Sequence, residues 1–160
     1  MSTIRGLKSD ASLSGSGMRI AIVKTNWNTV VVDALVAGCE ARLKELGAVH
    51  IVVEEVGGAF ELPLAASVLA KSGKFDAVIP IGCLIKGETM HFEYISGAAV
   101  DGLMRVGLDT GVVVINGILN VLSEKQALAR AGLEGTHGNE GTGWATTAVQ
   151  QVSLLRKYRL

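Results

Sequence analysis

Aromatic residues are scarce in this chain, at 4% of 160 residues, and neither sign of charge dominates, since 15 acidic side chains balance 15 basic ones. A formal net charge of zero gives no electrostatic reason to expect nucleic acid or an anionic membrane as a partner. No apolar run approaches the roughly 18 residues that a membrane-spanning helix needs. Only two cysteines occur, Cys39 and Cys83, and residues 1–17 lack the apolar core of a signal peptide, so we expect a reduced, cytoplasmic protein.

Several catalytic signatures are also missing. The sequence has no metal-ligand spacing, no Walker loop, no GxGxxG and no GxSxG. We therefore expect neither a metal nor a bound cofactor. Glycine, by contrast, is abundant at 20 residues, and hydrophobic residues make up 49%. This composition is typical of a compact α/β domain that is long enough to bury a core.

Four short apolar runs alternate with helical patterns. The runs cover residues 19–24, 51–56, 77–82 and 112–115. Continuous apolar character, rather than alternation, is typical of strands in a parallel sheet that helices cover on both faces. We therefore expect a three-layer α/β sandwich with a four-stranded parallel sheet. Pro80 cannot donate a backbone hydrogen bond, so its run is expected at a sheet edge or near a strand end.

The expected helices have recognisable ends. The first carries an apolar stripe from Val32 to Leu46, begins after Asn28 as a capping residue and ends at Gly47. Further helices are expected over residues 60–71, 92–106 and 127–131, the last of these after a capping box of Ser123 and Gln126.

Two glycine-containing stretches are expected to lie outside the helices. Residues 1–17 are rich in serine and glycine, and we interpret them as an N-terminal arm before a single domain of residues 18–160. Residues 137–143 are polar and glycine-rich, so we expect a loop there and a final helix that begins at Trp144.

Ligands of parallel α/β sheets bind at the carboxyl ends of the strands. This rule selects four loops, at residues 25–28, 57–61, 83–91 and 116–120. The third loop reads CLIKGETMH and enters a helix, whose free N–H groups and positive dipole end suit a phosphate. Lys86 would add positive charge, and His91 could act as an acid–base group. The alternative is a capped helix with an ordinary exposed histidine.

The other candidates have ordinary explanations as well. Glu61 follows a glycine turn and could simply cap it. Trp27 could stack on a flat ring or pack against an edge of the core. Arg130 could be a solvated helix charge, and Cys83 has no surrounding motif that would make it a nucleophile.

Taken together, four segments resemble the lumazine synthase family, and its fungal branch more than most. They are Asn26-Trp27-Asn28, GAFELPLAA at 58–66, IGCLIKGETMHFEYIS at 81–96 and EKQALARAG at 124–132. The resemblance runs from about Arg19 to Leu155. It implies a flavodoxin-like sandwich with a four-stranded parallel sheet, assembled as a homopentamer or a multiple of one, including icosahedral shells. The site would lie between adjacent subunits.

The resemblance also implies a reaction in riboflavin biosynthesis. The family condenses 5-amino-6-(D-ribitylamino)uracil with 3,4-dihydroxy-2-butanone 4-phosphate to 6,7-dimethyl-8-ribityllumazine, and releases phosphate and water. His91 would be the proton donor. The implied pyrimidinedione-binding residues are Trp27, Ala59, Phe60, Glu61, Cys83, Leu84, Ile85 and Asn116. The implied phosphate-binding residues are Glu88, Thr89 and, from the adjacent subunit, Arg130, with Lys86 and His137 as further candidates. Each step moves protons, and none needs a metal or a redox cofactor.

Four positions depart from the family pattern. Gly57 stands where proline is usual, Asn116 where many members have phenylalanine, Asn120 where threonine is usual, and Glu140 near a common lysine or histidine. His137 is the candidate that could replace that last positive charge. These departures leave a second class of function open, a weakly active or inactive paralogue that binds lumazine or flavin or forms a shell. An unrelated flavodoxin-like phosphate-binding protein is the third.

Overall fold

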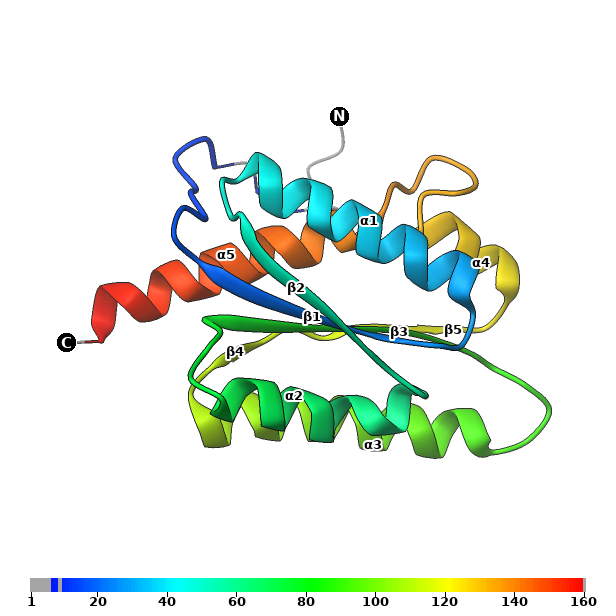
Figure 1. The fold of residues 1–160 in the computed structure, drawn as a ribbon. Helices are drawn as coiled ribbons and strands as arrows, with labels where there is room; N and C mark the ends of the chain where they lie inside the picture. Colours follow the sequence, from blue (N-terminus) through cyan, green and yellow to red (C-terminus); the bar gives the residue numbers. More distant parts are fainter. Residues whose placement is uncertain (1–6, 9, 160) are drawn as a thin grey trace.

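The computed structural model describes residues 7–8 and 10–159 (Figure 1). The elements in chain order are β1 (Arg19–Thr25), α1 (Thr29–Glu45), β2 (His50–Val56), the short 3-10 turn η1 (Ala59–Glu61), α2 (Leu62–Lys71), β3 (Ala77–Ile85), α3 (His91–Thr110), β4 (Val113–Val114), β5 (Gly117–Val121), α4 (Glu124–Arg130) and α5 (Glu140–Tyr158). Among these residues, no helix is both long and apolar enough to cross a membrane.

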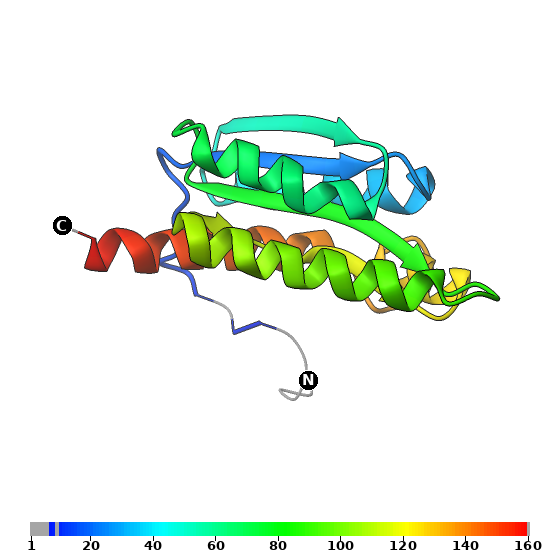
Figure 2. The same cartoon turned by 90° about the horizontal axis from the view of Figure 1, so that it is seen from below.

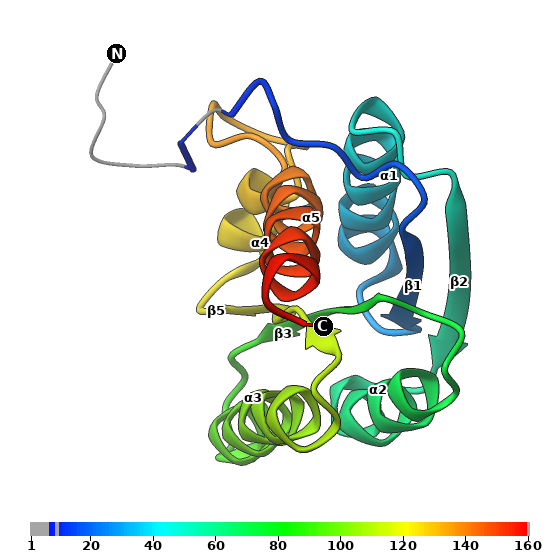
Figure 3. The same ribbon diagram turned by 90° about the vertical axis from the view of Figure 1, so that its left-hand side faces the viewer.

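All strand pairs are parallel, and the sheet runs in the order β2-β1-β3, with β4 and β5 both paired to the free side of β3. Helices α1, α4 and α5 cover one face, while α2 and α3 lie side by side on the other (Figures 2 and 3). Each face has its own apolar cluster, because successive residues of a buried strand point to opposite sides. The expected three-layer α/β sandwich is therefore confirmed.

The sheet has five strands rather than the expected four, and Pro80 accounts for the difference. It lies inside β3, between β1 and the β4–β5 side, so the edge or strand-end position expected for it is wrong. Val78 accepts from the Ile115 N–H at 3.0 Å, and alternate residues of a strand face the same neighbour, so Pro80 faces that side too. Pro80 has no N–H to donate, and the Ile115 carbonyl instead accepts from the Gly117 N–H at 3.1 Å. The same register then resumes with Gly117 opposite Ile81.

The division of this side of the sheet into β4 and β5 also corrects one expected loop. Residues 117–121 form β5, so the loop that follows this side of the sheet begins at Leu122 and not at residue 116. Ser123 caps α4 as expected, since its hydroxyl accepts from the Gln126 N–H at 3.3 Å. Gly47 follows the end of α1 with a φ of 88°, as expected for a helix stop.

The glycine-rich stretch before the last helix is mostly not a loop, because α5 begins at Glu140 rather than at Trp144. Asn139 organises this start: its side-chain oxygen accepts from the Gly141 N–H at 2.8 Å, and its amide donates to Ala34 O at 2.7 Å and Ala131 O at 3.0 Å. Gly141 packs directly on α1, where a Cβ would overlap the carbonyl oxygen of Leu35. Glycine is thus required here by close helix packing rather than by a turn.

The described part of the N-terminal arm lies close to the domain. The Gly15 N–H donates to Leu46 O at 2.6 Å, and Leu13 packs against the cluster beneath α1 and α5. Residues 1–6 and 9 of the arm lie outside the described residues.

Replacing each of two glycines of α5 by alanine should change the free energy of unfolding differently. Gly141→Ala is expected to lower the free energy of unfolding by about 2–3 kcal/mol, because the new methyl group must push α5 away from α1. Gly143→Ala, two residues further on, meets only a Leu7 methyl at 3.8 Å and should be neutral or stabilising by up to about 1 kcal/mol. Urea denaturation of both variants measures the difference. Equal stability would contradict the close packing.

Candidate active site

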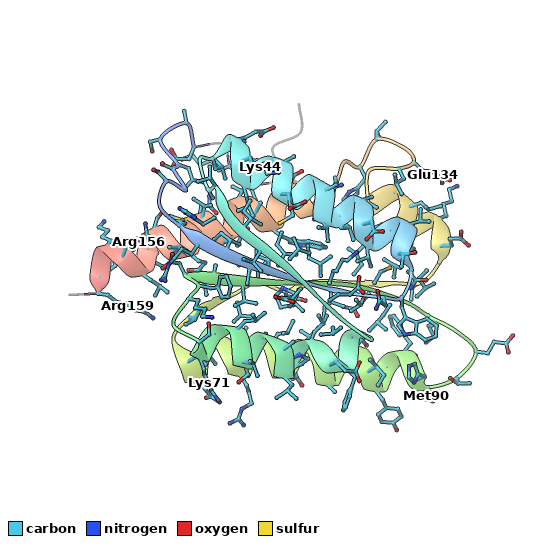
Figure 4. All side chains as sticks on the ribbon, in the orientation of Figure 1. Lys44, Lys71, Met90, Glu134, Arg156 and Arg159 are labelled. Atoms are coloured by element: carbon cyan, nitrogen blue, oxygen red, sulfur yellow. The ribbon has the colours of Figure 1, made fainter. Side chains whose placement is uncertain are left out.

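The carboxyl ends of β1, β2, β3 and β5 meet at one end of the molecule, on the right in Figure 1. The starts of α1, α2, α3 and α4 lie there as well. Figure 4 shows Met90 and Glu134 at this end, and Arg156 and Arg159 at the opposite one. Three of the four expected loops, at residues 25–28, 57–61 and 83–91, therefore converge as predicted.

Trp27 and Glu61 approach each other across Gly58. A Cβ at Gly58 would lie 3.3 Å from a Glu61 carboxylate oxygen and 3.5 Å from Cδ1 of Trp27, so glycine leaves room for both. Trp27 is 70% exposed and Phe60 is 60% exposed, while Ala59 is buried. Trp27 does not pack against the edge of the core. Two large rings thus stand open beside one carboxylate, an arrangement suited to a flat polar ligand.

Asn28 joins this group to the end of β3. The structure does not show the expected side-chain cap on α1; instead the Asn28 amide donates to the Cys83 carbonyl at 2.9 Å. Its φ is 52°, the only positive value for a non-glycine residue in the described chain. Asparagine tolerates this left-handed conformation better than most residues do. Backbone strain of this kind is commonly found at binding sites.

The last residues of β3 supply backbone rather than reactive side chains. Cys83 is buried, and burial raises the pKa of its thiol to about 11, so the sulfur remains protonated near neutral pH. A nucleophilic role for Cys83 is therefore not supported. Leu84 and Ile85 are partly buried and lead into the next loop.

Residues 86–90 form that loop, which runs into the first residue of α3, His91. The Lys86 N–H donates to Val121 O at 2.9 Å, which ties the loop to β5. The Thr89 hydroxyl accepts from the His91 N–H at 3.3 Å, and no side chain caps α3 at Met90. Glu88, Thr89 and His91 are exposed. The start of a 20-residue helix is thus open to solvent, and it favours an anion.

Lys86 is not a free cation in this loop. Its ammonium group pairs with the Glu93 carboxylate in the first turn of α3. The hydrogen bond from Lys86 holds the pKa of Glu93 below its usual value. No sequence pattern predicts that these two residues form a pair.

Three further candidates lie on other segments of the chain. Asn116 lies at the break between β4 and β5, in a shallow apolar groove with Met104 and Leu155. Arg130 ends α4, partly buried, with its guanidinium donating to Gln126 O at 3.4 Å. His137 lies before α5, 3.5 Å from the Glu140 carboxylate.

Comparisons with known proteins relate the chain to one family. The sequence profile of the 6,7-dimethyl-8-ribityllumazine synthase family matches residues 17–156. The 6,7-dimethyl-8-ribityllumazine synthase of Schizosaccharomyces pombe is 50% identical over 143 residues, which covers 88% of this chain and 89% of the relative. The proteins of the same name from Pyricularia oryzae and Xylella fastidiosa are 42% and 41% identical, over 85% and 92% of this chain and 87% and 96% of their own lengths.

The conformation and the hydrogen bond of Asn28 can be tested separately. Asn28→Gly removes the bond to Cys83 at a residue type that adopts this φ freely, and should cost about 1 kcal/mol of unfolding free energy. Asn28→Ala loses the same bond and keeps a β-carbon in the left-handed region without the tolerance of asparagine, so it should be about 1–2 kcal/mol less stable than the glycine variant. Urea denaturation of both variants gives the two values. If the alanine variant were as stable as the glycine variant, the conformational contribution would be absent.

Proposed function

The chain belongs to the 6,7-dimethyl-8-ribityllumazine synthase family, and we propose how its residues carry out the reaction of that family. The reaction joins 5-amino-6-(D-ribitylamino)uracil to 3,4-dihydroxy-2-butanone 4-phosphate in riboflavin biosynthesis, so the chain is a transferase. One observation carries this conclusion: the family match spans residues 17–156 and so includes every candidate residue from Trp27 to His137.

The chemistry requires proton transfer at each stage. The 5-amino group of the pyrimidine attacks the ketone, and loss of water gives an imine. Elimination then expels phosphate, and ring closure releases a second water. A histidine can donate and accept these protons near neutral pH. We assign this role to His91, because it is exposed at the start of α3, beside the loop proposed for phosphate.

The flat pyrimidinedione fits the first group of residues. Trp27 stacks on the ring, with Ala59, Phe60 and Glu61 along its edge and its ribityl chain. The exposed rings of Trp27 and Phe60 support this placement. Cys83, Leu84 and Ile85 line the pocket mainly by backbone, and the bond from Asn28 to Cys83 O holds that backbone in place.

The phosphate of the second substrate fits the loop before α3. The backbone N–H groups of Glu88 and Thr89 bind it, and the positive end of the α3 dipole favours its charge. Arg130 of the adjacent subunit completes the site, since a guanidinium forms two parallel hydrogen bonds to phosphate. Asn116 and His137 are also assigned to the neighbouring side, because within one subunit neither shares a pocket with residues of the converging loops.

An assembly of at least five subunits is part of the proposal. Large apolar side chains are exposed on α2 (Leu64, Val68), on α3 (Tyr94, Met104, Leu108) and on strand β2 (Val52, Val53). A monomer rarely leaves so many in water. A homopentamer, or a multiple of it up to an icosahedral shell, would cover them. The two free thiols, Cys39 and Cys83, support a cytoplasmic location.

The departures from the family pattern do not favour an inactive paralogue. Glu140 lies in the first turn of α5, where the helix dipole favours a negative charge. Asn120 is exposed, with its amide 3.3 Å from Ile118 O. A Cβ at Gly57 would meet no atom within 4 Å.

Lumazine formation from the two substrates, followed by absorbance against a protein-free blank, tests the activity and the role of His91. His91→Ala should lower kcat by about 10²-fold, because a positioned acid–base group contributes roughly that much. His50→Ala is the matched control, since His50 is an exposed histidine at the amino end of β2, away from the loops. A wild-type rate equal to the blank would defeat the enzyme assignment, and an unchanged His91→Ala rate would defeat the assignment of the residue.

Mixed assemblies test whether the site is shared. His91→Ala and Arg130→Ala subunits should each be nearly inactive alone. Co-assembled in equal amounts, they should regain about one quarter of the wild-type rate, because random neighbours around a ring place both intact residues at that fraction of sites. A single-subunit site would show no recovery. The particle mass, measured at the same concentration, should be five times the 16.7 kDa chain or a multiple of that.

A further inference from the structure

The Lys86–Glu93 pair closes the loop proposed for phosphate at both ends. The Lys86 backbone is fixed to β5 through the bond from its N–H to Val121 O. Its side chain reaches across the turn to Glu93 in α3. Residues 87–90 therefore lie between Lys86, which directly follows β3, and Glu93 in α3, and the ion pair joins these two positions.

Stability alone does not explain this pair. Both side chains are partly exposed, and ion pairs of that kind contribute little. The second carboxylate oxygen of Glu93, Oε2, is shielded from solvent and has no hydrogen-bond partner among the described residues. A shielded acceptor without a partner costs free energy, which an apolar side chain at this position would avoid. The pair is thus better explained by what it does to the loop.

Charge gives a second reason to treat the two residues as a unit. A bare carboxylate in the first turn of α3 would repel the anionic substrate, and Lys86 neutralises it. The bond from Lys86 lowers the pKa of Glu93, so Glu93 stays ionised and paired at neutral pH. An ammonium group that is already paired in this way is less available as a phosphate ligand.

We propose that Lys86 and Glu93 are positioning residues, whose ion pair holds residues 87–90 so that the Glu88 and Thr89 N–H groups face the substrate phosphate. The inference rests on the proposed function for the identity of that phosphate. It assigns Lys86 a different role from a direct ligand. The two roles predict opposite results when Glu93 alone is neutralised.

The experiment compares Lys86→Met, Glu93→Gln, the double neutral variant and the charge-exchanged variant Lys86→Glu/Glu93→Lys. Positioning predicts that each single change raises KM for 3,4-dihydroxy-2-butanone 4-phosphate about fivefold to tenfold, a coupling typical of paired residues. KM for the pyrimidine should stay within about twofold, since Trp27 and Phe60 lie on other loops. The double variant should be no worse than either single one, and charge exchange should restore most of the loss.

Asp109→Asn is the matched control. It removes the carboxylate of the exposed Arg105–Asp109 pair on the same helix and should change neither KM. Thermal unfolding of all variants checks that the fold is intact.

Two outcomes would overturn the proposal. If Glu93→Gln left the KM for the phosphate substrate unchanged or lowered it while Lys86→Met raised it, Lys86 would be a direct ligand. If both values of KM rose equally, the pair would act on the whole site.

Binding of inorganic phosphate, followed by calorimetry, separates this inference from the proposed function. A rate equal to the blank defeats the function. In that case, weaker phosphate binding in both single variants would still support positioning, and unchanged binding would overturn it.

Discussion

The parallel pairing of β1 with β3 is the constraint on which the rest of the chain depends. Parallel neighbours cannot be joined by a tight turn, so each connection must cross a face of the sheet, and helices fill those crossings. Both faces of the strands are then buried, which accounts for two apolar clusters rather than one. The same pairing directs the ends of both strands to one side. The bond from Asn28 to Cys83 O spans these two ends and joins the fold to the site.

Local patterns predicted most of this architecture. The apolar runs located β1, β2 and β3, and the glycine and serine signals located several helix ends. The edge position predicted for Pro80 is wrong because the rule for proline in strands depends only on its missing N–H and not on which acceptor lies opposite. Here the Ile115 carbonyl opposite Pro80 accepts a hydrogen bond from Gly117 instead, so the missing N–H is tolerated in a central strand. The pattern misses the start of α5 because glycine usually indicates a turn, whereas Gly141 is required by close contact with the backbone of α1, which is distant in the sequence.

The site was predictable to a similar extent, and for the same reason. The rule for parallel sheets selected three loops that do converge, and resemblance to one family selected residues within them. Contacts between side chains and backbone of different segments could not be predicted from the sequence. Asn28 has the sequence signature of a helix cap, yet its amide donates to the Cys83 carbonyl in β3, since a left-handed backbone turns the side chain away from its own helix. Lys86 likewise has the signature of a phosphate ligand, and only the structure shows that its ammonium group forms an ion pair with Glu93.

The separation of core and site has an energetic basis. The two buried clusters close without Trp27, Phe60 or the outer faces of α2 and α3, so folding of one subunit does not depend on them. An exposed large apolar side chain forgoes about 1.5–3 kcal/mol of burial, and this chain leaves many such side chains in water. That unused free energy remains available for substrate binding and association. In the proposed assembly, substrate binding uses the exposed rings at the carboxyl ends of the strands, where the neighbouring subunit supplies the guanidinium, and association buries the outer faces of α2 and α3 and strand β2. The large side chains that one subunit leaves exposed are therefore the ones that the proposed assembly and its shared site require.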